Sequence, residues 1–303
     1  MPSENLAGRT IAGYRLLERV GEGGSAAVYR AEHPERGLSA FKILKDRYRH
    51  DQVTVTRFLR EAGYGARVVH AGVVRTYDFG QVDGLHYLAL EWATGEPLST
   101  CISRDGPLEP ELVARIIDQL ADALTAAHAV GIIHRDLKPE NIIFDRAHDR
   151  AKLLDFGIAR DAQQPSAERL TRTGFFVGTL QYVAPEALSG MLVGEAADTY
   201  SLATITYYLL TGRHPFHGKS PRDLFTQLLN SDPRSLREAA GPDLVVTPGL
   251  EQAVMRGLSR DPAKRQQTIR EFADQVIAGI REKPPEPPPE GPVDRFLKAL
   301  GWR

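Results

Sequence analysis

The sequence contains a single cysteine, Cys101, among its 303 residues. No disulfide bond can therefore form within the chain, which is typical of proteins in the reducing cytoplasm. The first nine residues include no apolar segment and do not form a signal-peptide pattern. The longest apolar stretch, residues 202–210, is too short and too polar to span a bilayer. We therefore expect a cytoplasmic protein with no membrane segment.

The chain also has no excess charge of either sign. It contains 38 Lys and Arg residues against 39 Asp and Glu residues, for a formal net charge of −1. This balance argues against nucleic acid as a partner, because nucleic-acid-binding domains usually carry a basic surface. Hydrophobic residues make up 42% of the chain, which is enough for one large or two modest domains.

The residues with the clearest chemistry lie in the middle of the chain. The segment HRDLKPEN occupies residues 134–141, and DFG follows at residues 155–157. Two apolar runs with a polar turn between them predict a short hairpin from one segment to the other. Such a hairpin would bring Asp136, Asn141 and Asp155 to one cleft. Each of these residues alone is more often a solvated, capping or turn residue, but the joint pattern outweighs that explanation.

Both segments resemble the catalytic loop and the metal-binding tripeptide of protein kinases, in particular the bacterial Hanks-type Ser/Thr kinases. The resemblance covers about residues 10–280. It implies an α+β, bilobal fold with a small β-rich N-lobe, one control helix and a larger α-helical C-lobe. We expect an N-terminal segment at residues 1–13, an N-lobe at 14–90, a hinge at 91–95, a C-lobe at 96–280, and a Pro-rich linker with a short amphipathic tail at 281–303.

The resemblance also implies an activity and its cofactors. The chain is expected to transfer the γ-phosphate of ATP to Ser or Thr hydroxyls of proteins, with Mg²⁺ or Mn²⁺. Asp136 would orient or accept the hydroxyl proton, and Lys138 would lie against the transferred phosphate. Asn141 and Asp155 would supply oxygen ligands to the metal.

A glycine-rich segment near the N-terminus is the second candidate site. Gly21, Gly23 and Gly24 follow a predicted strand at residues 14–20. Glycines allow backbone N–H groups to approach phosphate oxygens closely. No Gly-Lys-Ser/Thr sequence follows, so the segment is not a Walker A motif. Alone it would be better explained as a plain hairpin turn, and only the resemblance makes it a phosphate-covering flap.

The kinase resemblance assigns an ion pair to the N-lobe. Lys42, in an apolar run on a predicted strand, would contact the α- and β-phosphates and pair with Glu61 on a helix predicted at residues 54–70. Gly63 and Gly65 interrupt this helix, and each lowers helix stability by about 1 kcal/mol relative to Ala. Two explanations remain open: close packing against a neighbour, or a loosely held helix whose position controls activity.

The resemblance also predicts the adenine contacts. Leu90 would be the gatekeeper, and backbone groups of the hinge would meet the adenine edge. Apolar side chains would enclose the ring, although any protein core might contain such residues. The expected contacts are Val20, Val28, Ala40 and Ile143 around the ring, and Glu91 and Ala93 at the hinge.

Residues 160–174 form a long polar segment before Ala184-Pro185-Glu186, which resembles an activation loop. Thr171 and Thr173 are predicted phosphorylation sites, with Arg135 as the phosphate partner. Ordinary loop threonines are the alternative. Thr179 is expected near the catalytic loop, where it would favour a Ser/Thr acceptor.

Further positions are expected to be structural. Asp198 would cap the catalytic-loop backbone, and Arg265 would pair with Glu186. His128 ends an apolar helical pattern and is interpreted as a packing residue and not as a ligand. In the tail, an apolar helical stripe that includes Phe296 suggests docking on the kinase domain or on a partner, or else a frayed end.

The expected partners are protein substrates, together with a possible homodimer for trans-autophosphorylation. The alternative function is a non-catalytic nucleotide-binding scaffold. A small-molecule phosphotransferase of similar fold is disfavoured, because the Ala-Pro-Glu segment and Thr179 belong to a peptide-docking platform in the family.

Overall fold

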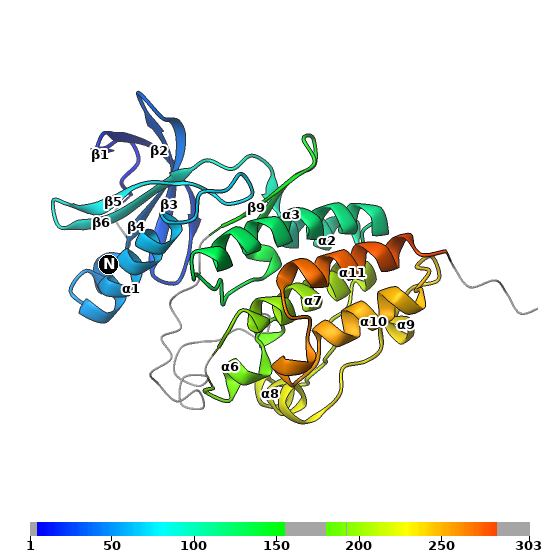
Figure 1. Ribbon diagram of the computed structural model, residues 1–303. Helices are drawn as coiled ribbons and strands as arrows, with labels where there is room; N and C mark the ends of the chain where they lie inside the picture. The colour runs from blue at the N-terminus through cyan, green and yellow to red at the C-terminus, as the bar shows by residue number, and fades with distance from the viewer. Residues whose placement is uncertain (1–4, 155–179, 192, 284–303) are drawn as a thin grey trace, which may run out of the picture.

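A computed structural model describes residues 5–154, 180–191 and 193–283. The chain forms two lobes, and a six-stranded antiparallel sheet makes up most of the N-terminal one (Figure 1). The order in the sheet is β1-β2-β3-β4-β6-β5. The strands are β1 (Thr10–Ile11), β2 (Tyr14–Glu22), β3 (Ala26–His33), β4 (Gly37–Leu44), β5 (Thr76–Val82) and β6 (Leu85–Glu91).

A two-residue turn joins β5 to β6. Asp83 and Gly84 both have positive φ, at 50° and 75°, as a tight hairpin turn requires. The sequence pattern predicts a strand at residues 73–79 and a turn at residues 82–84. The turn lies there, but the strand begins three residues later, at Thr76. Val73 does not join the N-lobe sheet. It forms a parallel bridge with Leu153 of the C-lobe instead.

Helix α1 (Gln52–Gly65) packs beside this sheet and buries Val55, Phe58 and Ala62. Its first turn is capped by Asp51, which accepts a hydrogen bond from the Val53 N–H. The helix was predicted to reach residue 70, but it ends five residues earlier. Beyond it the chain turns toward the C-lobe, where Arg67 donates to the Val130 carbonyl at 2.9 Å.

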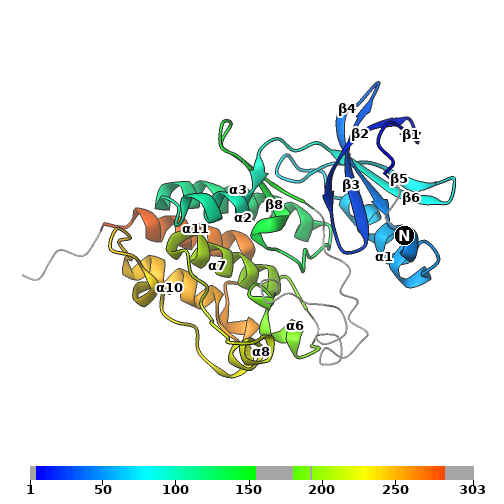
Figure 2. The same cartoon turned by 180° about the vertical axis from the view of Figure 1, so that it is seen from behind.

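The C-terminal lobe is mainly helical, and Figure 2 shows it from behind. Its central helix α7 (Ala196–Thr211) has all but two of its residues buried. The other helices are α2 (Leu98–Asp105), α3 (Pro110–Ala129), α6 (Pro185–Leu188), α8 (Pro221–Asn230), α9 (Leu236–Ala239), α10 (Pro248–Gly257) and α11 (Ile269–Arg281). Short 3-10 turns are η1 (Asp46–Tyr48), η2 (Pro139–Asn141) and η3 (Pro262–Lys264).

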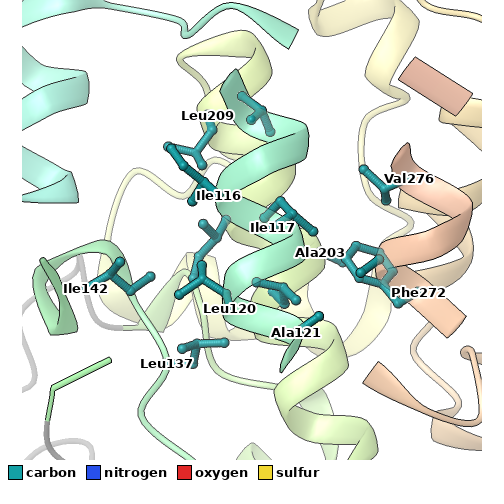
Figure 3. Close-up of a cluster of buried hydrophobic side chains, with 14 of the residues drawn as sticks. Ile116, Ile117, Leu120, Ala121, Leu137, Ile142, Ala203, Leu209, Phe272 and Val276 are labelled. Carbon is teal, nitrogen blue, oxygen red and sulfur yellow. The ribbon is translucent and has the colours of Figure 1, made fainter. Parts of the chain in front are cut away.

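The apolar periodicity of α3 explains how the C-lobe core forms. Ile116, Ile117, Leu120 and Leu124 recur at helical spacing, and all are fully buried. In Figure 3 side chains of α3 face residues of α7 and α11, and the catalytic-loop residue Leu137 lies at the edge of the same cluster. The loop that follows α3 is therefore built on the most densely buried part of the protein.

Besides the Arg67–Val130 hydrogen bond, the described residues join the two lobes at two places. The first is the hinge, where the Arg30 guanidinium lies 5.7 Å from the ring centre of Trp92. It leads into the small sheet of β7 (Glu96–Pro97), β8 (Ile142–Asp145) and β9 (Arg150–Leu153). The second is the backbone around the Val73 bridge, with Val74 N–H donating to the Leu153 carbonyl at 2.9 Å.

At the N-terminus, β1 extends the sheet ahead of residue 14, and Leu6 is buried in the same N-lobe core. Within the described ranges, no helix has the length and apolar character needed to cross a bilayer.

Candidate active site

The buried carboxylate of Asp198 binds the backbone of the catalytic loop. One carboxylate oxygen of Asp198 accepts the backbone N–H of His134 and the other accepts that of Arg135, both at 2.9 Å. The predicted cap is thus confirmed. Arg135 has a φ of 62°, which few non-glycine residues adopt, and the bond from its N–H to Asp198 stabilises this strained conformation.

His128 contacts Asp198, a role that the sequence did not indicate. Its Nε2 lies 2.8 Å from Asp198 Oδ2, the same carboxylate oxygen that accepts the His134 N–H, and its side chain is almost fully buried. Burial alone would raise the pKa of Asp198, but the hydrogen bonds from His128 and from the loop hold that pKa below its ordinary value. The only sequence clue was a histidine at the end of an apolar helix, a few residues before the loop.

Three of the predicted site residues form one cluster. Lys138 Nζ lies 2.9 Å from Asp136 Oδ2. The side-chain amide of Asn141 donates both to that oxygen, at 3.0 Å, and to the Asp136 carbonyl, at 2.8 Å. Because the nitrogen of Asn141 is directed at Asp136, its amide oxygen faces away from that residue and can act as an acceptor or ligand.

The predicted hairpin after the loop is confirmed. Strands β8 and β9 pair with Ile142 opposite Leu153, and the Leu154 N–H donates to the Asn141 carbonyl at 2.8 Å. The chain therefore returns to Asn141 at the residue just before Asp155. Asp155 itself, with Thr171, Thr173 and Thr179, lies outside the described residues.

Lys42 lies in the middle of the N-lobe sheet, on β4. Its register partners are Val28 on β3 and Leu88 on β6. Leu88 also lines a small cavity together with Glu61 of α1. The sheet and the helix thus direct the two predicted partners, Lys42 and Glu61, toward the same region behind the cleft.

Gly65 lines that same cavity at the end of α1. A Cβ atom added to Gly65 would lie 3.0 Å from Thr76 Oγ1, whereas one added to Gly63 would meet nothing within 4 Å. Of the two explanations for these glycines, close packing applies to Gly65 and not to Gly63.

The strand before the glycine-rich turn is two residues longer than the predicted strand at residues 14–20. Strand β2 continues through Gly21 to Glu22, and the Gly23 N–H then donates to the Ala26 carbonyl at 2.8 Å. None of the three glycines has positive φ, and a Cβ at any of them would meet no described atom closer than 3.6 Å. Their lack of a side chain therefore answers no steric need among the described residues.

Some of the predicted adenine contacts share one apolar cluster. Leu90, Ala40 and Ala93 belong to one apolar cluster together with Leu154. Val20 is 46% exposed, so its side chain is accessible to a ligand. Val28 and Ile143 are half-buried on β3 and β8.

Glu91 has contacts that the sequence did not indicate. Its backbone N–H donates to the Arg75 carbonyl at 2.8 Å. Its carboxylate accepts the Arg75 N–H at 3.2 Å and forms an ion pair with Lys152 of β9. Glu91 therefore links the hinge to the start of β5 and to the C-lobe hairpin.

The predicted pair of Glu186 and Arg265 is confirmed. Arg265 Nη1 and Nη2 each donate to one oxygen of the Glu186 carboxylate, at 2.7 and 2.8 Å. Both side chains are buried. This bidentate pair fixes the Ala-Pro-Glu segment, which starts α6, to the end of the C-lobe.

Comparisons with known proteins agree with this geometry. The family model of the protein kinase domain matches residues 14–279. Serine/threonine-protein kinase pkn3 of Myxococcus xanthus is 36% identical over 288 residues, which cover 93% of this chain and 52% of that protein. Serine/threonine-protein kinase PrkC of Bacillus subtilis is 34% identical over 270 residues, which cover 88% of this chain and 40% of that protein. The chain thus spans about half or less of the length of these curated relatives.

A solved structure gives the same result at the level of the fold. The crystal structure of the Mycobacterium tuberculosis PknI kinase domain is similar, with a TM-score of 0.69 and 31% sequence identity. The match covers 89% of this chain and 97% of that one. The α+β, bilobal fold expected from the sequence is therefore confirmed.

Proposed function

The chain belongs to the protein kinase family, and on that premise we propose that it transfers the γ-phosphate of ATP to Ser or Thr hydroxyls of proteins. Protein kinases in general use ATP and a divalent metal ion. The relatives described above carry the name serine/threonine-protein kinase. The observation that carries the proposal is the cluster of Asp136, Lys138 and Asn141 around one carboxylate.

In this proposal Asp136 orients the substrate hydroxyl and accepts its proton. The carboxylate is fixed from two sides, by the Lys138 ammonium and by the Asn141 amide. Fixed donors restrict its rotation, so one oxygen lone pair stays directed at the cleft. In this proposal Lys138 also stabilises the negative charge on the phosphate during its transfer.

The metal and the nucleotide fit the residues around this cluster. The amide oxygen of Asn141 is a hard ligand of the type that Mg²⁺ and Mn²⁺ prefer, and Asp155 would supply a second one. Bound metal would neutralise charge on the phosphates.

The glycine-rich turn and the hinge complete the proposed nucleotide site. Gly21, Gly23 and Gly24 add no side chains of their own to the turn, which leaves their backbone N–H groups open to a phosphate ligand. Lys42, paired with Glu61, is the proposed α/β-phosphate contact. For adenine we propose Val20, Val28, Ala40 and Ile143 around the ring and the backbones of Glu91 and Ala93 at its edge.

We further propose that the protein phosphorylates its own Thr171 or Thr173. Support comes from Arg135, whose Nε atom is buried and has no hydrogen-bond partner among the described residues. A buried guanidinium nitrogen without a partner is suited to a phosphate group.

The test uses purified protein with γ-labelled ATP and either Mg²⁺ or Mn²⁺, followed by phosphosite mapping. The wild type should become labelled on Thr171 or Thr173, while Asp136→Asn and Lys42→Met should not. Asp149→Asn is the matched control, because Asp149 is an exposed carboxylate on the β8–β9 turn, paired only with Arg115 among the described side chains. ATP binding without label on the protein itself or on a generic basic protein would favour the scaffold function instead.

A mixing experiment tests whether the reaction occurs between two copies of the chain. Asp136→Asn protein, which should not label itself, is incubated with a trace of wild type. Label on the variant would support transfer in trans, and label confined to the wild type would contradict it.

A further inference from the structure

The glycine-rich turn contains a carboxylate at its centre. Glu22 lies between Gly21 and Gly23, at the last position of β2, and its side chain is half exposed. A negative charge in a turn that covers phosphates would oppose nucleotide binding, because the triphosphate is itself strongly negative. Some other group must offset this charge if the turn is to work as a phosphate flap.

Lys45 is that group. It directly follows β4, three residues after Lys42, and its side chain is only 12% exposed. Its Nζ lies 2.6 Å from Glu22 Oε1, and this hydrogen bond lowers the pKa of Glu22. Arg19, three residues earlier on β2, forms a second ion pair with Glu22.

The same short segment holds the turn at two more points. The backbone N–H of Lys45 donates to the Ser25 carbonyl at 2.9 Å, and Arg47 Nη2 donates to the Gly24 carbonyl at 3.1 Å. The Arg47 guanidinium itself lies 4.7 Å from the ring centre of Tyr48, in η1. Residues 45–47 thus bind one side chain and two carbonyls of the turn, so these acceptors are already occupied.

We propose that Lys45 is a positioning residue for the nucleotide phosphates: it neutralises Glu22 and holds the glycine-rich turn with its N–H groups available to the ligand. This inference rests on the proposed function, since it presumes that the turn covers phosphates. If Lys45 acts only through the phosphates, its loss should weaken the binding of ATP. The affinity for a ligand without phosphates should stay the same.

The experiment measures dissociation constants by calorimetry for Mg²⁺-ATP and for adenosine. We expect Lys45→Met to weaken ATP binding roughly fivefold, which is the effect of changing the net charge of the turn by about one unit at short range in water. Arg19 then remains as the ion-pair partner of Glu22. Adenosine binding should not change. Lys45→Arg should keep ATP affinity near the wild-type value. In the Glu22→Gln background, the effect of Lys45→Met should largely disappear.

The matched control is Arg15→Met, which removes an exposed ion pair with Glu32 at 2.8 Å on the same sheet, away from the turn. Unchanged ATP affinity in Lys45→Met would overturn the inference. So would an equal loss for adenosine, which indicates general distortion, or a loss that persists in the Glu22→Gln background, which indicates direct contact of Lys45 with phosphate. ATP binding without phosphate transfer would count against the proposed function alone, and a wild type that binds no ATP would overturn both.

Discussion

His214 shows how one residue can make stability depend on pH. Its imidazole stacks on Tyr208 with ring centres 4.4 Å apart, and it meets the edge of Tyr182 at 5.4 Å. Its Nδ1 is buried and has no partner among the described residues. Burial, with a smaller contribution from His217, lowers the pKa of His214 to about 4.

The neutral form of His214 is therefore favoured in the folded state. Between pH 6.5 and 4 the unfolded chain binds a proton at this position that the folded protein does not, so stability falls as the pH is lowered. We expect the wild type to lose about 2 kcal/mol more than His214→Phe between pH 7 and pH 5. Urea unfolding of both proteins at the two pH values measures this difference. Parallel pH dependence would show that His214 is not its source.

Asp198 is a second residue whose substitution should change a measurable property of the protein. We expect Asp198→Ala to lower stability by about 1–3 kcal/mol for each backbone N–H left without an acceptor, at His134 and Arg135. Phosphate transfer should fall at least tenfold, because the catalytic loop loses its anchor. Chemical unfolding and kinase assays measure the two effects. The control is Asp118→Ala, which removes an exposed partner of Arg270. It should change neither the stability nor the rate of phosphate transfer strongly.

Among single residues, those with a complete motif could be predicted from the sequence. The loop residues Asp136, Lys138 and Asn141 came from eight consecutive matching positions, and the structure brings them together. His128 and the side chain of Glu91 could not be predicted, because their partners are 70 and 61 residues away in sequence. Contacts at similar distances, those of Asp198 with the catalytic loop and of Arg265 with Glu186, were predicted only because the family resemblance supplied them.

At the scale of elements, helix α1 offers a comparison between two glycines two residues apart. Gly63→Ala should raise stability by about 1 kcal/mol, because its Cβ would meet only open space. Gly65→Ala should raise stability by less than this, or lower it, because its Cβ would crowd Thr76 Oγ1. Thermal unfolding of the two variants tests this order, and equal gains in stability would contradict it.

The double variant should raise the activity of unphosphorylated protein if α1 is a point of control, and unchanged or lower activity would end that hypothesis.

Gly95 joins the hinge to β7, and its backbone allows no other residue. It has a φ of +106°, and a Cβ there would lie 2.4 Å from the Phe144 carbonyl oxygen on β8. We expect Gly95→Ala to lower the free energy of unfolding by about 3 kcal/mol or more, because backbone atoms must move. Gly37→Ala is the matched control, since Gly37 also has positive φ but faces open space, and it should cost only about 1 kcal/mol. Equal losses in urea unfolding would show that strain, and not the close approach, determines the effect.

The boundaries of elements were less predictable than their existence. The sequence predicted strand β2, the strand of Lys42 and helix α1, but it placed the end of α1 five residues too late and the start of β5 three residues too early. Between them, residues 66–75 bond to the C-lobe through Arg67 and Val73. Contacts with another lobe override local propensity, and local patterns do not contain them.

At the scale of the whole molecule, Arg265 joins separate parts of the C-lobe. Besides Glu186, it donates to the carbonyls of Ala196, Ser259 and Arg260. We expect Arg265→Met to cost about 3–5 kcal/mol, because it leaves a buried carboxylate without its partner. Combining it with Glu186→Leu should recover part of that loss. Urea unfolding of the single and double variants measures the coupling, and fully additive losses would contradict it.

The division into two lobes was predictable because a β-rich first third precedes a helical remainder. How the lobes are held together was not, since the bridge of Val73 with Leu153 and the ion pair of Glu91 with Lys152 each cross between distant segments. The residues that touch both lobes are therefore the ones to vary when their relative motion is studied.

The position of Trp92 has a practical consequence for such studies. The chain has only two tryptophans, Trp92 and Trp302. Trp302→Phe would leave a single indole at the hinge, beside the Arg30 guanidinium of the N-lobe. Because the emission of an indole responds to a nearby charge, this variant would report lobe opening and nucleotide entry by its intrinsic fluorescence, with no added dye.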